Sequence, residues 1–434
     1  MFADFMAWPA LAKVLICFVA VLAAGRLGLK LGLALALAGP LLGLWMGLGP
    51  SDLAEPCALA LGRPLTINLV LVVLLILVLS RLMQQTGQLQ RIVESFGVAA
   101  RSPKAAAAVM PALIGLLPMP GGALFSAPMV EASCPGWRAQ DDLGAKLATV
   151  NYWFRHHGEY WWPLYPGVIF SVALLHVQLW AYVLLMLPLA LVHVAAGWYF
   201  LLRPLELPAP ALTDRRGGWA AFLREVGPII TVVAALPLFW LVELGLSAAG
   251  RPAPWPPGAP LLAGLVAAVA QVCLKGRLGW RDLWAALKRM ETLDMTLLVL
   301  GVTIFQTFMS ESGAVALVQL DLARYGVPTL AMVAALPFLS GMLTGIAFAF
   351  VATSFPLVVP LFADAQGVAF MAWGALAFFC GYAGMMLSPV HICFLMSRDY
   401  FACSLGRCYG VFAPALAVVA VAAALWLGGW IILG

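Results

Sequence analysis

Long apolar runs alternate with short polar connections along this chain of 434 residues. An α-helix needs about 20 mostly apolar residues to cross the hydrocarbon core of a bilayer. The windows that meet this requirement are Trp8–Ala24, Leu31–Gly49, Thr66–Met83, Tyr160–His176, Leu179–Leu202, Pro228–Leu246, Pro260–Leu274, Met295–Met309, Ala369–Met396 and Tyr409–Ile432. We therefore expect an all-α polytopic membrane protein with about ten spanning helices.

Two further apolar stretches are interrupted too often to be single spans. The segment Leu116–Pro128 carries helix-breaking residues at its centre, namely Pro118, Pro120, Gly121 and Gly122. Broken backbone at membrane depth is tolerated only where protein or a water-filled cavity covers it. We therefore expect one re-entrant hairpin at about residues 104–131 and a second at about 327–362. An ordinary Pro-kinked helix is the alternative for the first.

The two halves of the chain match at an offset of 226 positions. The matched pairs are Met83 and Met309, Gly87 and Gly313, Pro111 and Pro337, Gly115 and Gly341, and Pro163 and Pro389. Each half then holds three spans, a hairpin and two spans. Because five crossings is an odd number, the halves should have inverted topology, as in many transporters. This divides the chain into a first repeat (1–205), a cytoplasmic linker (206–227) and a second repeat (228–434).

The composition agrees with a membrane protein and excludes a separate soluble domain. Charged residues make up 10% of the chain, whereas soluble domains carry about 25%. The net charge of +5 does not indicate nucleic-acid binding, because the basic residues lie in short loops between apolar runs. The eight cysteines form no CxxC pair, so we interpret them as free, packed thiols.

Lysine and arginine residues predict the orientation of the spans. With the N-terminus outside and ten crossings, the outside loops hold only Arg63, Arg251 and Arg324 of the 24 basic residues. Inside loops of membrane proteins carry an excess of Lys and Arg. Both termini are therefore expected outside. Amphipathic stretches before the two hairpins, Gly87–Ser102 and Gly313–Gly326, are expected to lie in opposite interfaces.

Ionisable residues concentrate in one apolar region, Asn151–Pro166, directly after the first hairpin. Such residues are costly within a membrane and usually functional. Arg155 suits a carboxylate or another oxyanion, although it is also one helical turn from Glu159 and can pair with it. The matching stretch of the second half contributes His391. Glycine and proline interrupt both stretches, so two broken helices are expected to meet near the midplane.

Candidate roles follow from side-chain chemistry. The expected carriers of a coupling proton or ion are His156, His157, Glu159 and His391. The expected substrate-binding residues are Pro120, Gly121, Gly122, Ser126, Asn151, Arg155, Ser340, Thr344, Gly345, Thr353, Ser354 and Ser388. The alternative for each histidine is a structural, hydrogen-bonded role. The alternative for the small residues of the second hairpin, such as Gly345, is close packing between helices. No metal site and no cofactor are expected, because the HHGE sequence is not the HExxH of zinc proteases.

The motifs LPMPGGALFSAP and NYWFRHHGEYWWPLYPG resemble those of an uncharacterised prokaryotic integral-membrane family. As architecture, nearly the whole chain resembles the ion transporter superfamily, which includes gluconate permeases, dicarboxylate/sodium symporters, arsenite permeases and sodium/proton antiporters. The resemblance implies a homodimer in a prokaryotic inner membrane and an elevator mechanism. Dicarboxylate members carry a Ser-Asn-Thr type motif at each hairpin tip, from which this chain departs.

Together these observations predict a secondary active transporter, not an enzyme. The expected substrate is a small anionic solute such as an organic acid, and the expected coupling ion is a proton or sodium. A passive channel or exporter is the second hypothesis, and uphill flux would distinguish it. An intramembrane enzyme is the third, but the sequence offers no nucleophile or metal set for it. Apart from the lipid bilayer and a second copy, no macromolecular partner is expected, nucleic acid included.

Overall fold

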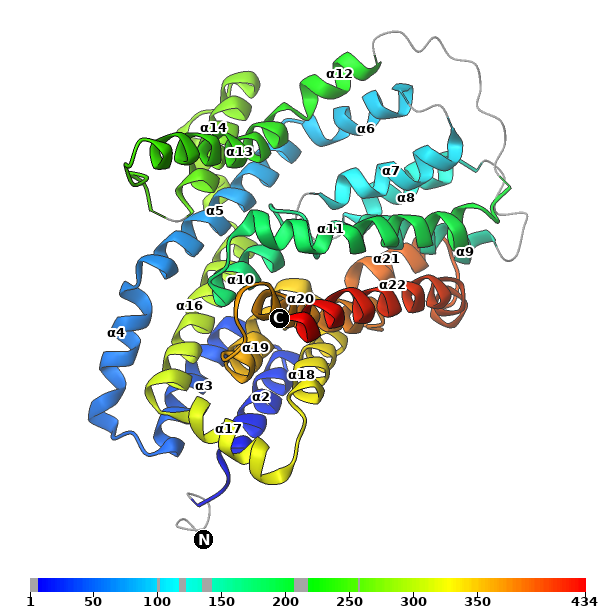
Figure 1. Ribbon diagram of the computed structural model, residues 1–434. Helices are drawn as coiled ribbons and strands as arrows, with labels where there is room; N and C mark the ends of the chain where they lie inside the picture. Colours follow the sequence, from blue (N-terminus) through cyan, green and yellow to red (C-terminus); the bar gives the residue numbers. More distant parts are fainter. Residues whose placement is uncertain (1–6, 100–101, 117–121, 135–142, 207–217, 257) are drawn as a thin grey trace.

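The computed structural model describes residues 7–99, 102–116, 122–134, 143–206, 218–256 and 258–434. Within these ranges every regular element is helical (Figure 1). Elements α6, α12, α13 and α14 lie toward one end of the molecule, and α2, α3 and α17 lie toward the other. Between the two ends lie α9, α10, α20 and α21. The candidate coupling residues His156, His157, Glu159 and His391 lie in the segments that connect α9 to α10 and α20 to α21.

The first half contains ten described α-helices, three of which begin with proline. They are α2 (Ala10–Arg26), α3 (Leu31–Met46), α4 (Ala54–Gly62), α5 (Pro64–Gln85), α6 (Gln88–Ala99), α7 (Pro103–Gly115), α8 (Ala123–Ala132), α9 (Leu143–Arg155), α10 (Pro166–Leu175) and α11 (Leu179–Ala196). A π-helical turn, Gly197–Leu202, extends α11. Proline occupies the first position of α5, α7 and α10, where its missing N–H costs no helical hydrogen bond.

The second half is built from a similar series of helices. They are α12 (Gly218–Glu225), α13 (Gly227–Ala248), α14 (Ala259–Gly276), α15 (Trp280–Leu287), α16 (Met290–Glu311), α17 (Ala314–Tyr325), α18 (Thr329–Thr344), α19 (Ala347–Val358), α20 (Gly367–Met386), α21 (Ile392–Tyr400) and α22 (Leu405–Leu433). Helix α20 is the central element of this half, because it packs against both α18 and α22 and two-thirds of its apolar span is buried.

Seven of the described helices are long and apolar enough to cross a membrane, namely α5, α11 with its π-helical turn, α13, α14, α16, α20 and α22. The bent pair α17–α18 makes an eighth if it counts as one span, with an angle of 116° between its helices. These helices support a multi-pass membrane protein. They are fewer than the ten expected spans because α2, α3 and α10 have only 17, 16 and 10 residues.

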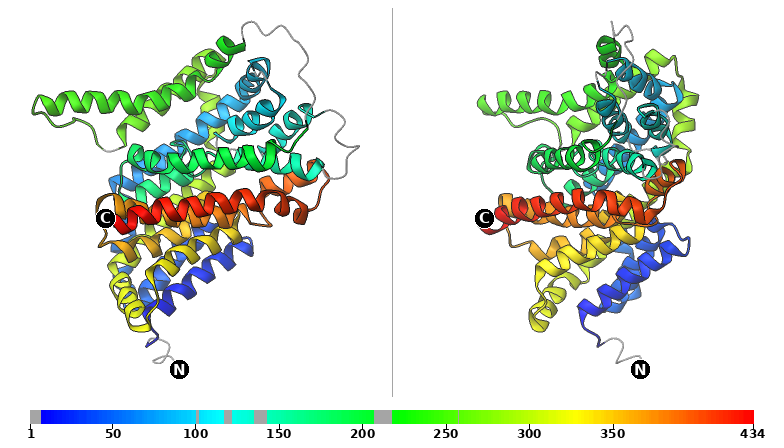
Figure 2. Two further views of the ribbon diagram at one scale, coloured as in Figure 1. Left: turned by 45° about the vertical axis from the view of Figure 1, so that its right-hand side comes forward. Right: turned by 90° about the vertical axis from the view of Figure 1, so that its right-hand side faces the viewer.

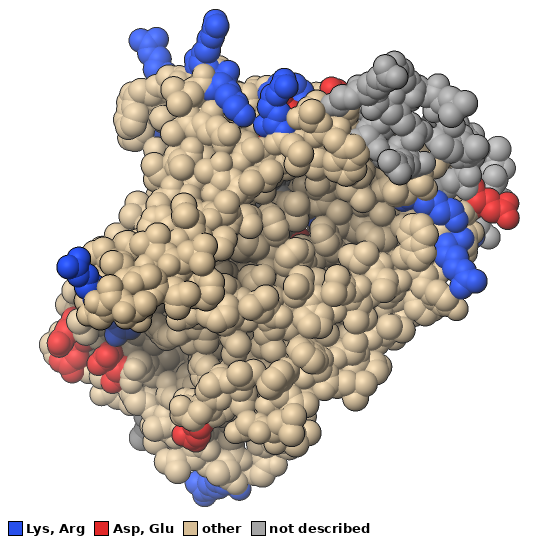
Figure 3. All heavy atoms as spheres, turned by 45° about the horizontal axis from the view of Figure 1, so that its top comes forward, with Lys and Arg blue, Asp and Glu red and all other residues tan. Residues whose placement is uncertain are grey.

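On the face drawn in Figure 3, most of the charged side chains lie toward the margin. Figure 3 shows Lys and Arg along one edge and at the periphery, around a broad area without charged groups. Helix α13 extends away from the other helices (Figure 2), and only 11% of its apolar span is buried within the chain. Its apolar surface therefore suits contact with lipid or with another membrane protein.

Short helices occupy both regions where hairpins are expected. Helices α7 and α8 pack against each other, as do α18 and α19. Gly345 joins the second pair and has a φ of +65°, which glycine adopts without steric cost. The tip of the first pair, residues 117–121, lies outside the described residues. The expected amphipathic stretches form α6 and α17, each directly before its helix pair.

Candidate functional site

Two breaks in the helical chain meet in the middle of the molecule. The first lies between α9 and α10, and the second lies between α20 and α21. Gly158 and Pro163 in the first break, and Pro389 in the second, disfavour a continuous helix. Helices α8, α9 and α21 pack against one another beside this crossing (Figure 1). We call this region the crossing of the two breaks.

Two buried tyrosines join the breaks through the backbone. The hydroxyl of Tyr152 on α9 donates to the carbonyl oxygen of Met386 at the end of α20, at 3.1 Å. The hydroxyl of Tyr382 on α20 donates to the carbonyl oxygen of His156 in the first break, at 3.3 Å. The carbonyl of His156 also accepts from the backbone N–H of Glu159 at 3.2 Å, so the Tyr382 hydroxyl is its second donor. Each tyrosine thus ties one half of the chain to a backbone carbonyl at the break in the other half.

A pair of buried histidines forms the centre of the crossing. The Nε2 atoms of His156 and His391 are 3.0 Å apart, and the two residues are 0% and 5% exposed. Nδ1 of His156 lies 2.6 Å from the carbonyl oxygen of Tyr152. Because a carbonyl only accepts, this Nδ1 carries a proton, and Nε2 of a neutral His156 is then an acceptor. In the absence of other ligands, His391 donates to it.

Glu159 supplies a buried carboxyl group to the same cluster. Its Oε1 accepts a hydrogen bond from the hydroxyl of Tyr165 and lies 3.7 Å from Nε2 of His156. Its Oε2 has no hydrogen-bond partner among the residues that the structure describes. A buried polar atom of this kind is costly unless a ligand, a proton or water satisfies it. The carboxyl group therefore has capacity for one more partner.

Arg155 ends α9 and is only 3% exposed. A Cβ at Gly122 would lie 2.6 Å from the Cζ of Arg155, so the guanidinium packs directly on the glycine before α8. A Cβ at Gly115 would lie 1.9 Å from the backbone oxygen of Arg155. Two glycines therefore allow α7 and the start of α8 to approach this arginine closely.

Asn151 connects three helices at one point. Its Nδ2 donates to the carbonyl oxygen of Ala123 at the start of α8, at 3.1 Å, and to the Oγ of Ser397 on α21, at 2.9 Å. Its Oδ1 has no hydrogen-bond partner among the described residues. This amide thus fixes the first residue of α8 against the crossing and has one acceptor to spare.

The second helix pair touches the crossing through its tip. A Cβ at Gly345 would lie 3.0 Å from the Cα of His391 and 3.1 Å from the Oγ of Ser388. That Oγ donates to the carbonyl oxygen of Met342 at 2.7 Å, near the end of α18. Gly345 and Ser388 therefore place the tip of this pair directly beside the histidine pair.

The other expected hydroxyl ligands are satisfied within their own helix pairs. Oγ of Ser340 and Oγ1 of Thr353 are 2.5 Å apart and tie α18 to α19. Thr344, Ser354 and Ser126 each donate to a backbone carbonyl one turn earlier. The structure therefore gives these groups a role in holding the pairs together, and their contact with a substrate stays a prediction.

The structure brings together Gly122, Asn151, Arg155, His156, Glu159, Gly345, Ser388 and His391. His157 lies next to this cluster in sequence but makes different contacts. Its Nδ1 lies 2.8 Å from the carbonyl oxygen of Phe154, and its ring contacts Trp161. Pro120 and Gly121 lie outside the described residues, so their expected binding role stays a prediction.

Three members of the cluster were not expected from the sequence, namely Tyr152, Tyr165 and Cys393. The Sγ of Cys393 and a ring nitrogen of each of His156 and His391 lie within 4.8 Å of one another. Cys393 looked like one more packed thiol in an apolar helix, and a His-x-Cys spacing with His391 was the available signal. Tyr165 was detectable through the repeat, because it matches His391 at the offset of 226.

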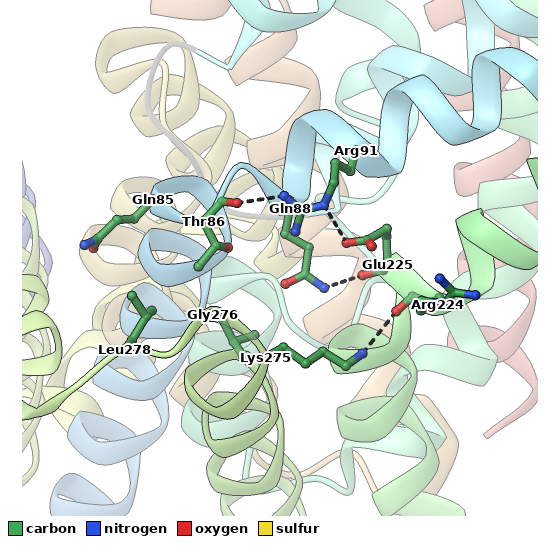
Figure 4. A pocket seen from close by; sticks show the side chains of 10 residues that line it. Gln85, Thr86, Gln88, Arg91, Arg224, Glu225, Lys275, Gly276 and Leu278 are labelled. Atoms are coloured by element: carbon green, nitrogen blue, oxygen red, sulfur yellow. Dashed lines mark hydrogen bonds and ion pairs between the residues drawn. The ribbon is translucent and has the colours of Figure 1, made fainter.

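A polar pocket of about 470 Å³ lies elsewhere, between α5, α6, α12 and α14 (Figure 4). Arg91 forms an ion pair with Glu225 at 3.1 Å, and Gln88 donates to the backbone oxygen of Glu225 at 2.6 Å. Nζ of Lys275 lies 3.4 Å from the backbone oxygen of Arg224. These contacts fasten α12 to α6 and to α14, so we do not place the candidate site there.

Comparison with known proteins gives a family but no activity. No curated protein matches the chain. A family described as "Protein of unknown function (DUF401)" matches residues 13–249 and 259–433, which together span nearly the whole chain. The chain, with its crossing of two broken helical segments, therefore belongs to the DUF401 family.

Proposed function

We propose that this chain is a secondary active transporter that moves a small anionic solute, such as an organic acid, across a membrane. The observation that carries the proposal is the burial of Arg155 against Gly122, beside the crossing of the two breaks. Charged side chains inside membrane proteins usually mark substrate pathways. A guanidinium binds carboxylates and other oxyanions through paired hydrogen bonds.

The helix starts around the crossing also favour an anion. Helix α8 begins at the Ala123 carbonyl that Asn151 holds, and His391 is the N-cap residue of α21. Gly167 in the first turn of α10 faces Ala347 in the first turn of α19. A Cβ added at Gly167 would lie 3.3 Å from the Cβ of Ala347, so the two helix starts are in close contact. N–H groups at helix starts attract anions, and transporters use half-helix ends at their binding sites.

The helix boundaries support a plan of two repeats. Six helices of the second half begin 226 positions after a described helix of the first half. The paired first residues are Ala54 and Trp280, Pro64 and Met290, Gln88 and Ala314, Pro103 and Thr329, Pro166 and Ile392, and Leu179 and Leu405. The regularity extends well beyond the five sequence matches, because helix boundaries depend on packing as well as on residue type.

Two close helix contacts follow the same offset. A Cβ at Gly115 would meet the backbone oxygen of Arg155 at 1.9 Å, and a Cβ at Gly341 would meet that of Gly381 at 2.0 Å. The halves also pack crosswise, since α8 contacts α21 and α19 contacts α10. Both observations favour two related halves that share one central site, as inverted-repeat transporters do.

The mechanism we propose is alternating access of the elevator type within a homodimer. The two helix pairs and the two broken segments would move together against the remaining helices, with the apolar surface of α13 available for a second copy or for lipid. Proton or sodium coupling, both termini outside and a prokaryotic inner membrane belong to the same proposal. The candidate coupling residues are His156, His157, Glu159 and His391.

The experiment begins with thermal-shift screening of the purified protein against organic acids and inorganic oxyanions, with and without sodium, at two pH values. The best ligand is then used for uptake into proteoliposomes. Arg155→Ala should remove both the ligand-induced shift and the uptake, because the solute loses its charged partner. Arg155→Lys should retain only part of the affinity, since lysine lacks the planar fork of arginine.

Arg281→Ala is the matched control, because Arg281 is exposed on α15 and distant in sequence from the crossing. Each variant must elute as a single species and unfold cooperatively before its uptake is compared. Normal uptake by folded Arg155→Ala protein would remove Arg155 from the binding site. Uptake that never exceeds equilibrium, even under a proton or sodium gradient, would favour a passive channel instead.

A further inference from the structure

Three side chains at the crossing form a compact set of nitrogen and sulfur donors. One ligand atom from each of His156, His391 and Cys393 lies within 4.8 Å of the other two. The residues are 0%, 5% and 8% exposed, so water competes little for these atoms. The sequence did not predict this set, because His156 and His391 are 235 positions apart.

The backbone prepares His156 to be a ligand. Its Nδ1 proton is held by the carbonyl oxygen of Tyr152 at 2.6 Å, which leaves a lone pair on Nε2. Histidines that bind metals usually donate their other N–H to a carbonyl or a carboxylate in this way, which fixes the ring and its tautomer. The lone pair points at Nε2 of His391, 3.0 Å away.

A carboxyl group stands beside these donors. Oε1 of Glu159 lies 3.7 Å from Nε2 of His156 and is oriented by the hydroxyl of Tyr165. The other oxygen, Oε2, has no partner in the described part of the chain, nor does Nδ1 of His391. Glu159 lies outside the set of three mutually close donors, so its carboxyl group has to move toward an ion at this place to become the fourth ligand. The cluster has unmet hydrogen-bonding capacity.

The distances suit a tetrahedral ion. Zn²⁺ binds His nitrogen at about 2.0–2.1 Å and Cys sulfur at about 2.3 Å. Two imidazole nitrogens on one such ion are then about 3.3 Å apart, and a nitrogen and a sulfur about 3.6 Å. The two Nε2 atoms are 3.0 Å apart, which is close to the value of about 3.3 Å expected for two imidazole nitrogens on one ion. The distances from Cys393 Sγ to the histidine nitrogens are at most 4.8 Å. The thiol therefore has to move by up to about 1 Å to reach the value of about 3.6 Å expected between nitrogen and sulfur.

We propose that His156, His391 and Cys393, with Glu159 as the fourth ligand, bind a soft divalent transition-metal ion of the Zn²⁺ type. Thiolate and imidazole donors select such ions over Mg²⁺ and Ca²⁺, which prefer oxygen. A divalent charge balances the thiolate and the carboxylate. His156 and Glu159 come from the first break and the other two ligands from the second, so the ion fastens the halves together.

This inference does not depend on transport, but an ion bound to His156, Glu159 and His391 would leave only His157 of the candidate coupling residues to carry a proton. The test measures metal binding directly. The purified full-length protein is dialysed against a chelator and titrated with CoCl₂, then with ZnCl₂. We expect one Co²⁺ per chain, the thiolate-to-cobalt charge-transfer absorption in the near ultraviolet, and the intense visible bands of tetrahedral cobalt. ZnCl₂ should abolish both signals and raise the melting temperature, since it binds only the folded state.

Cys393→Ser should remove the charge-transfer absorption and weaken Zn²⁺ binding at least about 10-fold. Cys17→Ser is the matched control, because Cys17 is also 8% exposed but lies on α2. Should Cys393→Ser fail to fold, His391→Gln gives the same test through loss of the tetrahedral bands. Wild-type protein without the charge-transfer absorption, or folded Cys393→Ser protein that binds Zn²⁺ as tightly as wild type, would overturn the proposal.

Discussion

Substituting Gly122 tests whether the position of the Arg155 guanidinium matters for function. A Cβ at residue 122 would lie 2.6 Å from the Cζ and from both terminal nitrogens of Arg155. Favourable contacts between such atoms are about 3.5–4.0 Å. Gly122→Ala therefore forces the guanidinium to withdraw by about 1 Å. The side chain is flexible at that end, so the fold has a way to accommodate the methyl group.

The expected loss is in binding and not in stability. Misplacing a binding group by about 1 Å costs up to about 100-fold in rate. We therefore expect Gly122→Ala to lower solute uptake by about 10- to 100-fold with little change in the melting temperature. Gly115→Ala should behave differently, because its Cβ would lie 1.9 Å from the backbone oxygen of Arg155, which cannot move alone. Overpacking of this kind destabilises by about 1–3 kcal/mol or more.

The assay compares these two variants with Gly62→Ala, whose Cβ would meet nothing within 4 Å. Uptake into proteoliposomes reports function, and thermal unfolding in detergent reports stability. Gly122→Ala should separate the two measurements, Gly115→Ala should lower both, and Gly62→Ala should change neither. Wild-type uptake by Gly122→Ala would show that the solute does not depend on the position of Arg155, and the proposed binding mode would fail.

Two further predictions address the crossing and its movement. Asn151→Ala removes the two hydrogen bonds that the amide donates to the Ala123 carbonyl and the Ser397 hydroxyl. It should lower the free energy of unfolding in mixed detergent by about 1–3 kcal/mol, and an unchanged value would mean that water replaces the amide. Single cysteines at Leu116 and Thr344, in a chain that keeps the buried Cys393 as its only native cysteine, should change their reactivity toward impermeant thiol reagents when the solute is added. Constant reactivity at both positions would contradict the proposed movement of the two helix pairs.

Much of the helical order was predictable because local chemistry decides it. Pro163 and Pro166 placed a break before α10, and the amphipathic run Gly87–Ser102 corresponds to α6, Gln88–Ala99. Hydropathy was less informative about spans, because a buried helix within the protein does not need full membrane length. Ten residues suffice for α10, which hydropathy alone had extended back to Tyr160.

The candidate site was predictable only in part, because packing between distant segments builds it. Arg155 and His156 stood out as ionisable residues in an apolar region. Cys393 did not, since a thiol in an apolar helix has no local signature. Ser340 and Thr353 were expected to bind substrate, but their hydroxyls hydrogen-bond to each other between α18 and α19. The sequence could not distinguish these two roles, because a small polar residue in an apolar run looks the same in both cases.

The crossing of the two breaks also has a consequence for biosynthesis. Asn151 bonds to Ser397, 246 positions later, and Tyr152 bonds to the carbonyl of Met386, 234 positions later. Chains are made from the N-terminus, so α9 is complete long before its partners exist. Unsatisfied polar groups are costly in lipid. The first half therefore has to be held unfinished by the insertion machinery, by a chaperone or by water, until α20 and α21 emerge to complete it.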